Sequence, residues 1–297
     1  MSILVDAGPH TLSWQYREDG DAADPGTTTI GIVDGNGDVV VAAGTATSGT
    51  GTDPRTYSLA AIDNPTELLA TWTYSGGTIT DRISVVGGWL FTESQARTFD
   101  NAVLAATGTV APSDAAIAEE RDAIAADLER WTGRSWIPRY CRVEADGTGT
   151  RELWLDKGIA RTADGRKLTC PGRATDTIEL LSVTVNGTSV STANVAVLDG
   201  VLWRTDSTWT EATDSARFNV VVEFVYGVEP GTNGSDRIAL TLLRDRLVPS
   251  NISDRASSFS DELGTYRFVT AGFGSNVTSI PEVNAWVQAN DRRLLVT

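Results

Sequence analysis

The chain has few of the residues on which most catalytic and metal sites depend. Its 297 residues include one histidine, His10, and two cysteines, Cys141 and Cys170. A Ser-His-Asp triad or a Cys-His pair would have to recruit His10 from the N-terminal lead-in, where it follows a proline. A zinc site needs about four ligands, and these three residues are far apart in the sequence. No catalytic, metal or cofactor residue is therefore predicted, and we expect a protein that is not an enzyme.

Disulfide patterns and long apolar runs are also lacking. Two cysteines do not make a disulfide framework, and we predict two reduced, buried thiols. No run reaches the ~20 apolar residues that cross a bilayer, so no membrane partner is expected. The segment Met1–Asp6 has no basic region and no long apolar stretch, unlike a signal peptide. We therefore expect synthesis in the cytoplasm.

Basic residues are outnumbered. The 24 lysines and arginines stand against 39 carboxylates, which gives a formal charge of −15. Residues 1–88 hold eleven of those carboxylates against Arg17, Arg55 and Arg82, so this part carries −8. An acidic surface repels the phosphate backbone, which argues against general nucleic-acid binding.

The first third is rich in glycine, threonine and valine, a composition typical of short strands joined by tight turns. The turn sequence Asp34–Asp38 lies between two β-rich runs and predicts a hairpin. With Trp72 as a candidate core residue and no cysteine pair, the pattern predicts a sandwich of immunoglobulin or fibronectin type without a disulfide. The predicted strands are Thr11–Tyr16, Thr29–Val33, Val39–Ala43, Arg55–Ala60, Leu68–Tyr74 and Thr78–Val86.

Three further features have both a chemical and a structural interpretation. The turn that begins at Asp34 resembles the start of a calcium loop, but its twelfth position is Thr45 and not glutamate, so a hairpin turn is favoured. Carboxylate pairs such as Glu152 and Asp156 are the residue types of glycosidase acids, yet in so acidic a chain a solvated surface is the simpler interpretation. The nine tryptophans could form a sugar-stacking face on the sandwich, although such residues more often pack in a core.

Two helices are predicted next. Thr92–Gln95 has the spacing of a capping box, which opens a helix through roughly Ala105. Ser113 caps a second helix over Asp114–Trp131, and Gly133 ends it. The apolar face of the second helix is predicted to hold Ile117, Ile124, Leu128 and Trp131.

Strand patterns then return and are followed by a third helix. Asn186-Gly187 and Asp199-Gly200 are hairpin turns. Asp236 is the expected cap of a helix from Arg237 to about Val248. The predicted strands are Tyr140–Glu144, Arg151–Leu155, Thr177–Val185, Val195–Leu198, Val201–Arg204 and Phe218–Tyr226.

The last part of the chain changes in composition. Ser250–Ser279 is rich in serine and glycine, which predicts an extended arm. Pro281 suits the first turn of a terminal helix that runs to about Leu295. The expected fold class is α+β. We predict an Ig-like β-sandwich over residues 1–88, a helical and β body over 89–249, and an extended C-terminal arm with a docking helix over 250–297.

The stretch from Ser113 to Val248 resembles the head-tail connector, or adaptor, family of long-tailed bacteriophages. That family typically has a helix ending in an acidic residue, a Thr-Gly-Arg turn and an aromatic-apolar entry into a strand. The matching residues are the helix Ala116–Trp131, the turn Thr132-Gly133-Arg134 and the entry Ser135–Arg139. Further matches in strand order are Leu153-Trp154-Leu155, Ile178–Gly187 and Val220–Gly227.

The resemblance implies a structural virion protein, assembled in the host cytoplasm and located in the neck at the head-tail interface. It implies a ring of identical subunits, a dodecamer, that binds the portal protein on one face and a stopper or tail-completion protein on the other. DNA would pass through the channel of this ring without sequence-specific binding. The chain departs from small family members by its added N-terminal Ig-like domain.

In related adaptors a C-terminal segment docks into the portal, and here that segment would be Ser279–Thr297. The alternative is a helix that packs on its own subunit. A second hypothesis for the whole protein is a tail or neck decoration protein whose Ig-like domain binds host-surface glycans. The predicted docking residues are Pro281, Val283, Trp286, Val287, Leu294 and Leu295.

Overall fold

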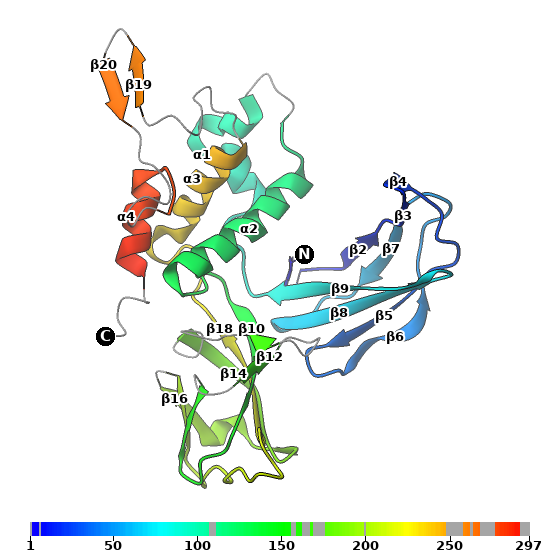
Figure 1. Ribbon diagram of the computed structural model, residues 1–297, viewed down its shortest axis with the longest axis vertical. Helices are drawn as coiled ribbons and strands as arrows, with labels where there is room; N and C mark the ends of the chain where they lie inside the picture. The colour runs from blue at the N-terminus through cyan, green and yellow to red at the C-terminus, as the bar shows by residue number, and fades with distance from the viewer. Residues whose placement is uncertain are drawn as a thin grey trace. The chain divides into compact units, whose positions relative to one another are not determined.

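The chain contains both helices and strands, 25% and 39% of it respectively, which confirms the α+β class. No helix in the part that the structure describes is long and apolar enough to cross a membrane. The structure is a computed structural model (Figure 1) that describes residues 2–5, 7–106, 111–155, 159–161, 167–168, 176–198, 200–247, 258–261, 264–267 and 277–291.

Two compact units make up the chain, and each is discontinuous in sequence. Unit 1 consists of Met1–Gly88 and Pro138–Tyr226, and unit 2 of Trp89–Ile137 and Gly227–Thr297. This division differs from the predicted boundaries, because the strands of the predicted body 89–249 belong to the same unit as the N-terminal strands. The two groups of strands pack closely at Gly35: a Cβ built on this residue would lie within 2.9 Å of the Tyr140 ring.

The N-terminal part of unit 1 has a five-stranded sheet in the order β1-β9-β8-β5-β6 (Figure 1). All neighbours in it are antiparallel except β1, which pairs with β9 in parallel. The bounds are β1 Ser2–Leu4, β5 Thr29–Asp34, β6 Val39–Ala46, β8 Thr66–Tyr74 and β9 Gly77–Val86. Two-stranded sheets are formed by β2 His10–Trp14 with β7 Arg55–Leu59, and by β3 Arg17–Glu18 with β4 Asp21–Ala22.

A shared core joins β2 and β7 to the five-stranded sheet. Leu12 and Leu59 bury their side chains against the inner face that carries Ile30, Ile32 and Trp72. Apolar residues at every second position of β2, β5 and β8 create that face, as the alternation predicts. The six predicted strands and the core position of Trp72 are confirmed, whereas β1, β3 and β4 were not predicted.

The predicted hairpin at residues 34–38 is confirmed. The Asp34 carboxylate accepts hydrogen bonds from the backbone N–H groups of Asn36, at 2.9 Å, and Asp38, at 3.0 Å. These bonds hold a tight turn between β5 and β6, and they use the carboxylate oxygen that a calcium loop would offer to the ion.

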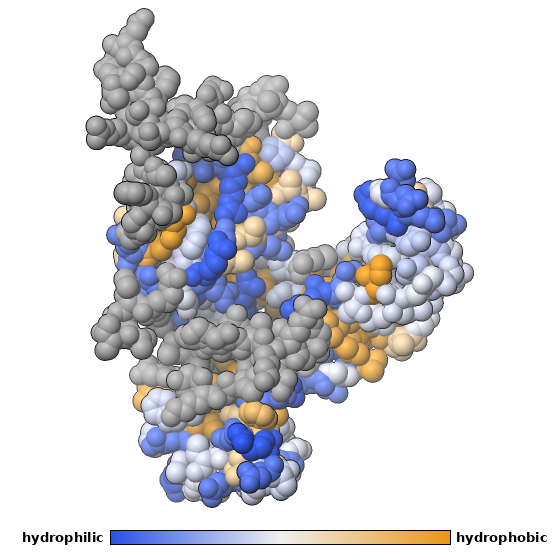
Figure 2. Space-filling model, viewed as in Figure 1, coloured by the Kyte–Doolittle hydropathy of each residue, from blue (hydrophilic) through white to orange (hydrophobic). Residues whose placement is uncertain are grey.

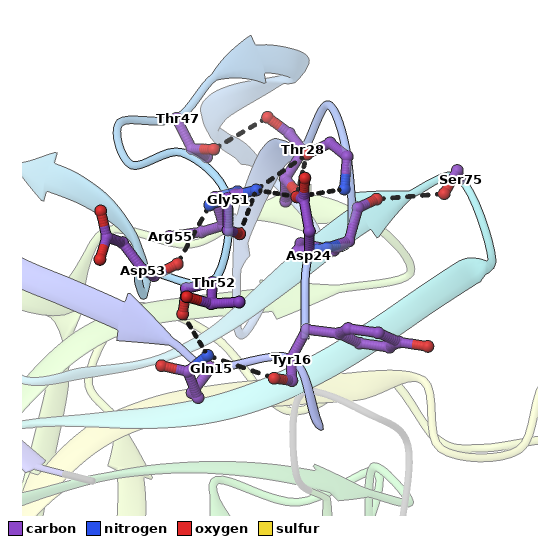
Figure 3. Close-up of polar contacts among 12 residues, drawn as sticks. Gln15, Tyr16, Asp24, Thr28, Thr47, Gly51, Thr52, Asp53, Arg55 and Ser75 are labelled. Atoms are coloured by element: carbon purple, nitrogen blue, oxygen red, sulfur yellow. Dashed lines mark hydrogen bonds and ion pairs between the residues drawn. The ribbon is translucent and has the colours of Figure 1, made fainter. Parts of the chain in front are cut away.

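Arg55 forms hydrogen bonds that connect several loops of residues 1–88 (Figure 3). Its guanidinium donates to the Asp24 carboxylate at 2.8 Å and to the backbone oxygens of Asp53, Gly26 and Gly51 at 3.0, 3.2 and 3.2 Å. Only 4% of the Arg55 side chain is exposed. Further bonds between the same loops run from Gln15 to Thr52, from Thr47 to Thr28 and from Ser75 to Pro25.

Replacing Arg55 by alanine is expected to lower the free energy of unfolding by about 2–4 kcal/mol. The reason is that the substitution removes a buried guanidinium together with its hydrogen bonds to one carboxylate and three backbone oxygens. Urea unfolding of the full chain measures the effect. Arg17→Ala is the matched control, because the Arg17 side chain is exposed and its guanidinium donates to the backbone oxygen of Gly20 at 2.9 Å, and the substitution should change stability by less than ~0.5 kcal/mol. Equal effects of the two substitutions would contradict the role given to Arg55.

The second part of unit 1 holds a six-stranded sheet in the order β13-β12-β10-β18-β14-β15 and a three-stranded sheet in the order β11-β17-β16. The central strand β18 is buried at six of its seven residues, as expected for a strand whose only polar residue is Glu223. The bounds are β10 Arg139–Ala145, β11 Glu152–Trp154, β12 Ile159–Arg161, β13 Lys167–Leu168, β14 Thr177–Val185, β15 Thr188–Ser189, β16 Val195–Leu198, β17 Val201–Arg204 and β18 Val220–Tyr226, with the short 3-10 helix η3 Thr192–Asn194.

Sequence signals placed these strands well. The predicted bounds of β14, β16 and β17 are those of the structure. Asn186 and Gly187 have φ of +51° and +74°, the left-handed pair that a two-residue hairpin between β14 and β15 requires. The second predicted turn joins β16 to β17 in an antiparallel pair, and its Asp199 lies outside the described residues.

The described residues of unit 2 include the helices α1, α2, α3 and α4 (Figure 1), and capping residues define both ends of α2. Ser113 accepts the N–H of Ala116 at 3.2 Å, and Gly133, at φ +68°, donates to Glu129 at 2.8 Å. The predicted cap and stop are thus confirmed. The bounds are α1 Glu93–Ala106, α2 Asp114–Thr132, η4 Thr232–Gly234, α3 Ser235–Leu247 and α4 Pro281–Asn290, with a hairpin of β19 Ser258–Asp261 and β20 Gly264–Arg267.

The C-terminal elements differ from their predictions in three ways. The third helix begins at Ser235, so Asp236 lies in its first turn and is not its cap. The terminal helix ends at Asn290 and not near Leu295. The β19–β20 hairpin lies within the segment Ser250–Ser279, for which the composition predicted no strand. The other residues of that segment up to 276 lie outside the described part of the chain.

Candidate partner-binding site

The predicted docking helix α4 packs against the helices α2 and α3 of its own unit. Val283 is 0% exposed and Val287 is 3% exposed, so the apolar face of α4 is already covered. Pro281 is exposed at the first turn of the helix, as predicted for a proline there. Leu294 and Leu295 lie outside the described residues. Among the predicted docking residues, Val283 and Val287 therefore have a packing role in this conformation, which corrects their assignment as open anchors.

Trp286 connects α4 to the end of α2. Its ring lies 4.6 Å from the ring of Trp136, centroid to centroid. Its indole N–H donates to the backbone oxygen of Asn233 at 2.8 Å. Trp136 is 1% exposed and donates its own indole N–H to Thr132 at 2.9 Å. A tryptophan pair of this kind buries apolar area and has a preferred ring orientation, so it fixes the position of α4 next to the end of α2.

The buried amide of Asn284 fixes the chain that leads into α4. Its oxygen accepts the backbone N–H groups of Val277 and Thr278, each at 2.9 Å, and its nitrogen donates to the oxygen of Thr278 at 2.8 Å. Asn284 is 4% exposed, so water does not reach its amide. The hydrogen bonds to the backbone of residues 277 and 278 therefore satisfy its polar atoms. Asn284 was not among the predicted site residues, although a polar residue on the apolar face of a helix is a recognisable signal.

Arg246 links α3 to α2. Its guanidinium donates to Glu120 at 3.1 Å and to Asp127 at 2.5 Å. Burial by itself would lower the pKa of Arg246, but the hydrogen bonds to Asp127 and Glu120 outweigh burial and raise that pKa above its ordinary value. The three residues form a charged clamp across the two helices.

Arg121 is a second residue that the sequence analysis missed. It lies on the buried face of α2 at 4% exposure, with its guanidinium carbon 3.6 Å from the centroid of the Trp89 ring. Burial lowers the pKa of Arg121. The Arg121 Nε and the Trp89 indole nitrogen are both buried, and neither has a hydrogen-bond partner among the residues that the structure describes. The signal was present, because residue 121 follows Ile117 by four positions and so shares its helix face.

The exposed large hydrophobic side chains in the described residues all belong to unit 1. Trp154 is 42% exposed, Trp203 is 40% exposed and Leu198 is 65% exposed on the three-stranded sheet. On the five-stranded sheet, Val39 is 69% exposed at the start of β6. Figure 2 shows apolar surface over the β5–β6 side of that sheet. Exposed aromatic and aliphatic groups of this kind are typical of protein contact surfaces. The remaining ones are Val40, Ile79 and Ile178.

Two of the tryptophans considered for sugar stacking, Trp14 and Trp72, are part of the core of the N-terminal strands. Trp14 is 8% exposed and Trp72 is 1% exposed, and their rings stack 6.1 Å apart. The Trp72 indole N–H donates to Asp81 at 3.1 Å. Neither ring offers an open face for a sugar, which corrects that interpretation for these two residues.

His10 and the two cysteines are the residues that were considered for catalytic and metal sites. His10 lies in β2, where its Nε2 is 2.9 Å from the backbone oxygen of Leu4. Cys141 is buried in β10, as predicted, while Cys170 lies outside the described residues. Within the ranges that the structure describes, no group of three histidine, cysteine or acidic side chains is placed to hold a metal ion.

A buried carboxylate in unit 1 binds two hydroxyl groups from the flanking strands. Glu223 of β18 is 5% exposed and accepts hydrogen bonds from Tyr140 of β10 and Ser182 of β14, both at 2.5 Å. Burial and the hydrogen bond to Glu223 raise the pKa of Tyr140 well above its ordinary value. The arrangement joins three neighbouring strands, which is a structural function.

This arrangement predicts a loss of stability at alkaline pH. Because the pKa of Tyr140 is raised in the folded state, folding keeps a proton that the unfolded chain releases near pH 10. The contribution of Tyr140 is thus complete below about pH 10 and falls as pH rises above it, by at most about 1.4 kcal/mol per pH unit. Tyr140→Phe should make the decrease shallower. Unfolding in urea at several pH values from 8 to 11 tests this, and an unchanged slope in the variant would contradict it.

No protein-family model matches the chain, and a search of curated proteins found no match either.

Proposed function

We propose that this chain is a structural virion protein, a head-to-tail adaptor. In this proposal its subunits form a ring that joins the portal to a stopper or tail-completion protein and encloses the DNA channel. The protein works by binding and carries out no reaction. Residues 1–88 serve as an added Ig-like domain beside the adaptor body.

The observation that carries the proposal is the segment of sequence that leads from α2 to the first residue of β10. The family pattern combines a capped helix, a Thr-Gly-Arg turn and an aromatic strand entry. In this chain Ser113 caps α2, Gly133 ends it in the left-handed conformation, and Trp136 is buried beside Thr132 immediately before the strand. The features that carry the resemblance therefore have definite structural functions here, which supports the assignment.

The charge of the chain agrees with a DNA channel. A subunit with a formal charge of −15 repels the phosphate backbone, so DNA is not retained by the wall of the ring. Sequence-specific contacts are not needed for such a passage. The negative charge of the subunit is consistent with a structural role and gives the ring no affinity for DNA.

Docking to the portal needs residues other than the covered face of α4. Val283, Trp286 and Val287 hold the helix on unit 2. The next large apolar residues in the sequence are Leu294 and Leu295. In our proposal these two leucines remain the docking anchors, and the packed helix fixes the point from which they reach the portal.

The proposal predicts stable binding to the portal protein encoded in the same genome. Purified full-length chain is mixed with purified portal and passed over a size-exclusion column. Co-elution at an equal number of subunits or another fixed ratio is expected. A genome without a portal gene, or separate elution at micromolar concentrations, would overturn the proposal.

A further inference from the structure

The guanidinium of Arg121 is buried in unit 2 with few hydrogen bonds. Arg121 is 4% exposed, and its guanidinium carbon lies 3.6 Å from the centroid of the Trp89 ring. Among the described residues its acceptor is the backbone oxygen of Phe91, which lies 3.5 Å from Nη1. That distance is at the outer limit of a hydrogen bond. A positive charge is therefore buried without the hydrogen bonds that normally accompany such burial.

The donors of Arg121 that lack an acceptor lie on one edge of the guanidinium. Nε is fully buried and has no acceptor in the part of the chain that the structure describes. Nη2, which lies on the same side of the guanidinium as the Nε–H, has no acceptor there either. This Nε–Nη2 edge is the one through which an arginine binds a carboxylate by two parallel hydrogen bonds.

Trp89 provides a third donor beside this edge. Its indole nitrogen is buried and also has no partner among the described residues. Because the guanidinium lies over the Trp89 ring, the indole N–H and the open edge are neighbours. A water molecule has two lone pairs and no charge, whereas a carboxylate has about four acceptor sites and a charge that balances the guanidinium. The three donors therefore suit a carboxylate better than a water.

The acidic side chains nearby limit the charge of such a ligand. Burial lowers the pKa of Arg121, and the charges of Asp122 and Glu93 offset only part of that effect. Neither carboxylate accepts a hydrogen bond from Arg121 in this structure. Both would repel a second negative charge, and a dianion such as phosphate more strongly than a monovalent ion. The surroundings of Arg121 thus favour a ligand with one negative charge.

We propose that unit 2 binds one small monovalent carboxylate ion, of the size of formate or acetate, at the Nε–Nη2 edge of Arg121 and the indole N–H of Trp89. Arg121 keeps 4% of its surface exposed, so the site is nearly closed and admits only a small ion. Trp89 is half-buried and is the first residue of unit 2, so a small displacement of its ring opens the edge. The inference does not depend on the proposed ring.

Acetate binding to the full-length chain tests the proposal. Ionic strength is kept constant with gluconate, a carboxylate too bulky for a nearly closed site. We expect a dissociation constant on the order of 1 mM, measured by saturation-transfer NMR on the acetate methyl group. At 100 mM acetate the thermal unfolding midpoint should rise by at least ~3 °C, because the ion binds the folded chain. No response to acetate, or an equal response to gluconate, would overturn the proposal.

Two arginine variants locate the site. Arg121→Met removes the donors and keeps an apolar side chain of similar length, and it should fold because replacing a buried charge by an apolar group is often neutral or stabilising. Its NMR signal transfer and its midpoint shift with acetate should both disappear. Arg130→Met, at an exposed arginine of the same helix, is the matched control and should respond as the unchanged chain does. An Arg121→Met variant that still binds acetate would overturn the assignment.

Two further variants separate an ion from solution from a group of the chain itself. Trp89→Phe keeps the ring and removes the N–H, and it should weaken acetate binding about 5- to 10-fold. Glu93→Gln removes a neighbouring negative charge and should strengthen acetate binding at least 2-fold. If the unchanged chain ignored acetate while Glu93→Gln bound it, the Glu93 carboxylate itself would occupy the edge, and the proposed site would be an internal ion pair. Equal binding by Trp89→Phe would contradict the role of the indole N–H.

Discussion

Replacing Trp136 by alanine is expected to lower the stability of unit 2 by about 3–5 kcal/mol. Trp136 is 1% exposed, its indole N–H donates to Thr132, and its ring contacts Trp286 of α4. The substitution leaves a cavity at the point where α2 ends and α4 packs. Amide hydrogen exchange of the full-length chain measures it, because protection in α2 and α4 should fall together.

Trp203→Ala is the matched control for this experiment. It removes the same side chain from a position that is 40% exposed in unit 1, and protection of α2 and α4 should not change. If Trp136→Ala left α4 as protected as before, the tryptophan pair would not be what holds the terminal helix.

Replacing Leu294 and Leu295 together by aspartate is expected to weaken binding to the portal about 100-fold. Burying each leucine in a partner contributes at least ~1.5 kcal/mol, and about 3 kcal/mol corresponds to two orders of magnitude in affinity. The thermal stability of the isolated chain should remain the same, since the packing of α4 depends on Val283, Trp286 and Val287. Surface binding of labelled chain to immobilised portal measures the affinity.

The pair Val283→Ala and Val287→Ala is the contrasting variant. It should lower stability by about 1–3 kcal/mol while Leu294 and Leu295 are kept. If portal binding depended on the two valines and not on the two leucines, α4 would have to leave unit 2 in order to dock, and the assignment of the anchors would be wrong.

Local signals predicted most of the fold. Both hydrogen bonds of the capping box at Thr92 are present. The Gln95 backbone N–H donates to the Thr92 hydroxyl at 3.2 Å, and the Thr92 backbone N–H donates to the Gln95 side-chain oxygen at 2.7 Å. The turns at residues 34–38 and at Asn186 also depend on neighbours in the sequence, and both are confirmed. In each case the stabilising partner is within four residues, so the sequence pattern contains the whole interaction.

Features that depend on distant partners were not predicted. The strand Ser2–Leu4 is too short to show alternation and is defined by its parallel pairing with β9. The sequence left two alternatives for α4, docking into the portal or packing on its own subunit. An apolar helix face indicates that it is covered but does not identify the surface that covers it. The division into two discontinuous units is of the same kind, since it depends on contacts between residues far apart in the chain.

The candidate surfaces show the same limit. Trp154 and Trp203 were noted only as parts of strands, and no pattern in either strand marks its tryptophan as exposed. The exposure follows from which face of the three-stranded sheet packs on the core of unit 1. Arg121 differs, because its position on the apolar face of α2 was visible in the sequence and was overlooked.

The most direct test of the account is the particle mass of the purified full-length chain, alone and with the portal encoded in the same genome, measured by mass photometry and followed by electron microscopy. The account predicts a single closed-ring species whose mass is a whole multiple of 31.6 kDa, with the dodecamer as the expected multiple. A chain that stays at 31.6 kDa at every concentration, with the portal present as well as absent, would contradict it.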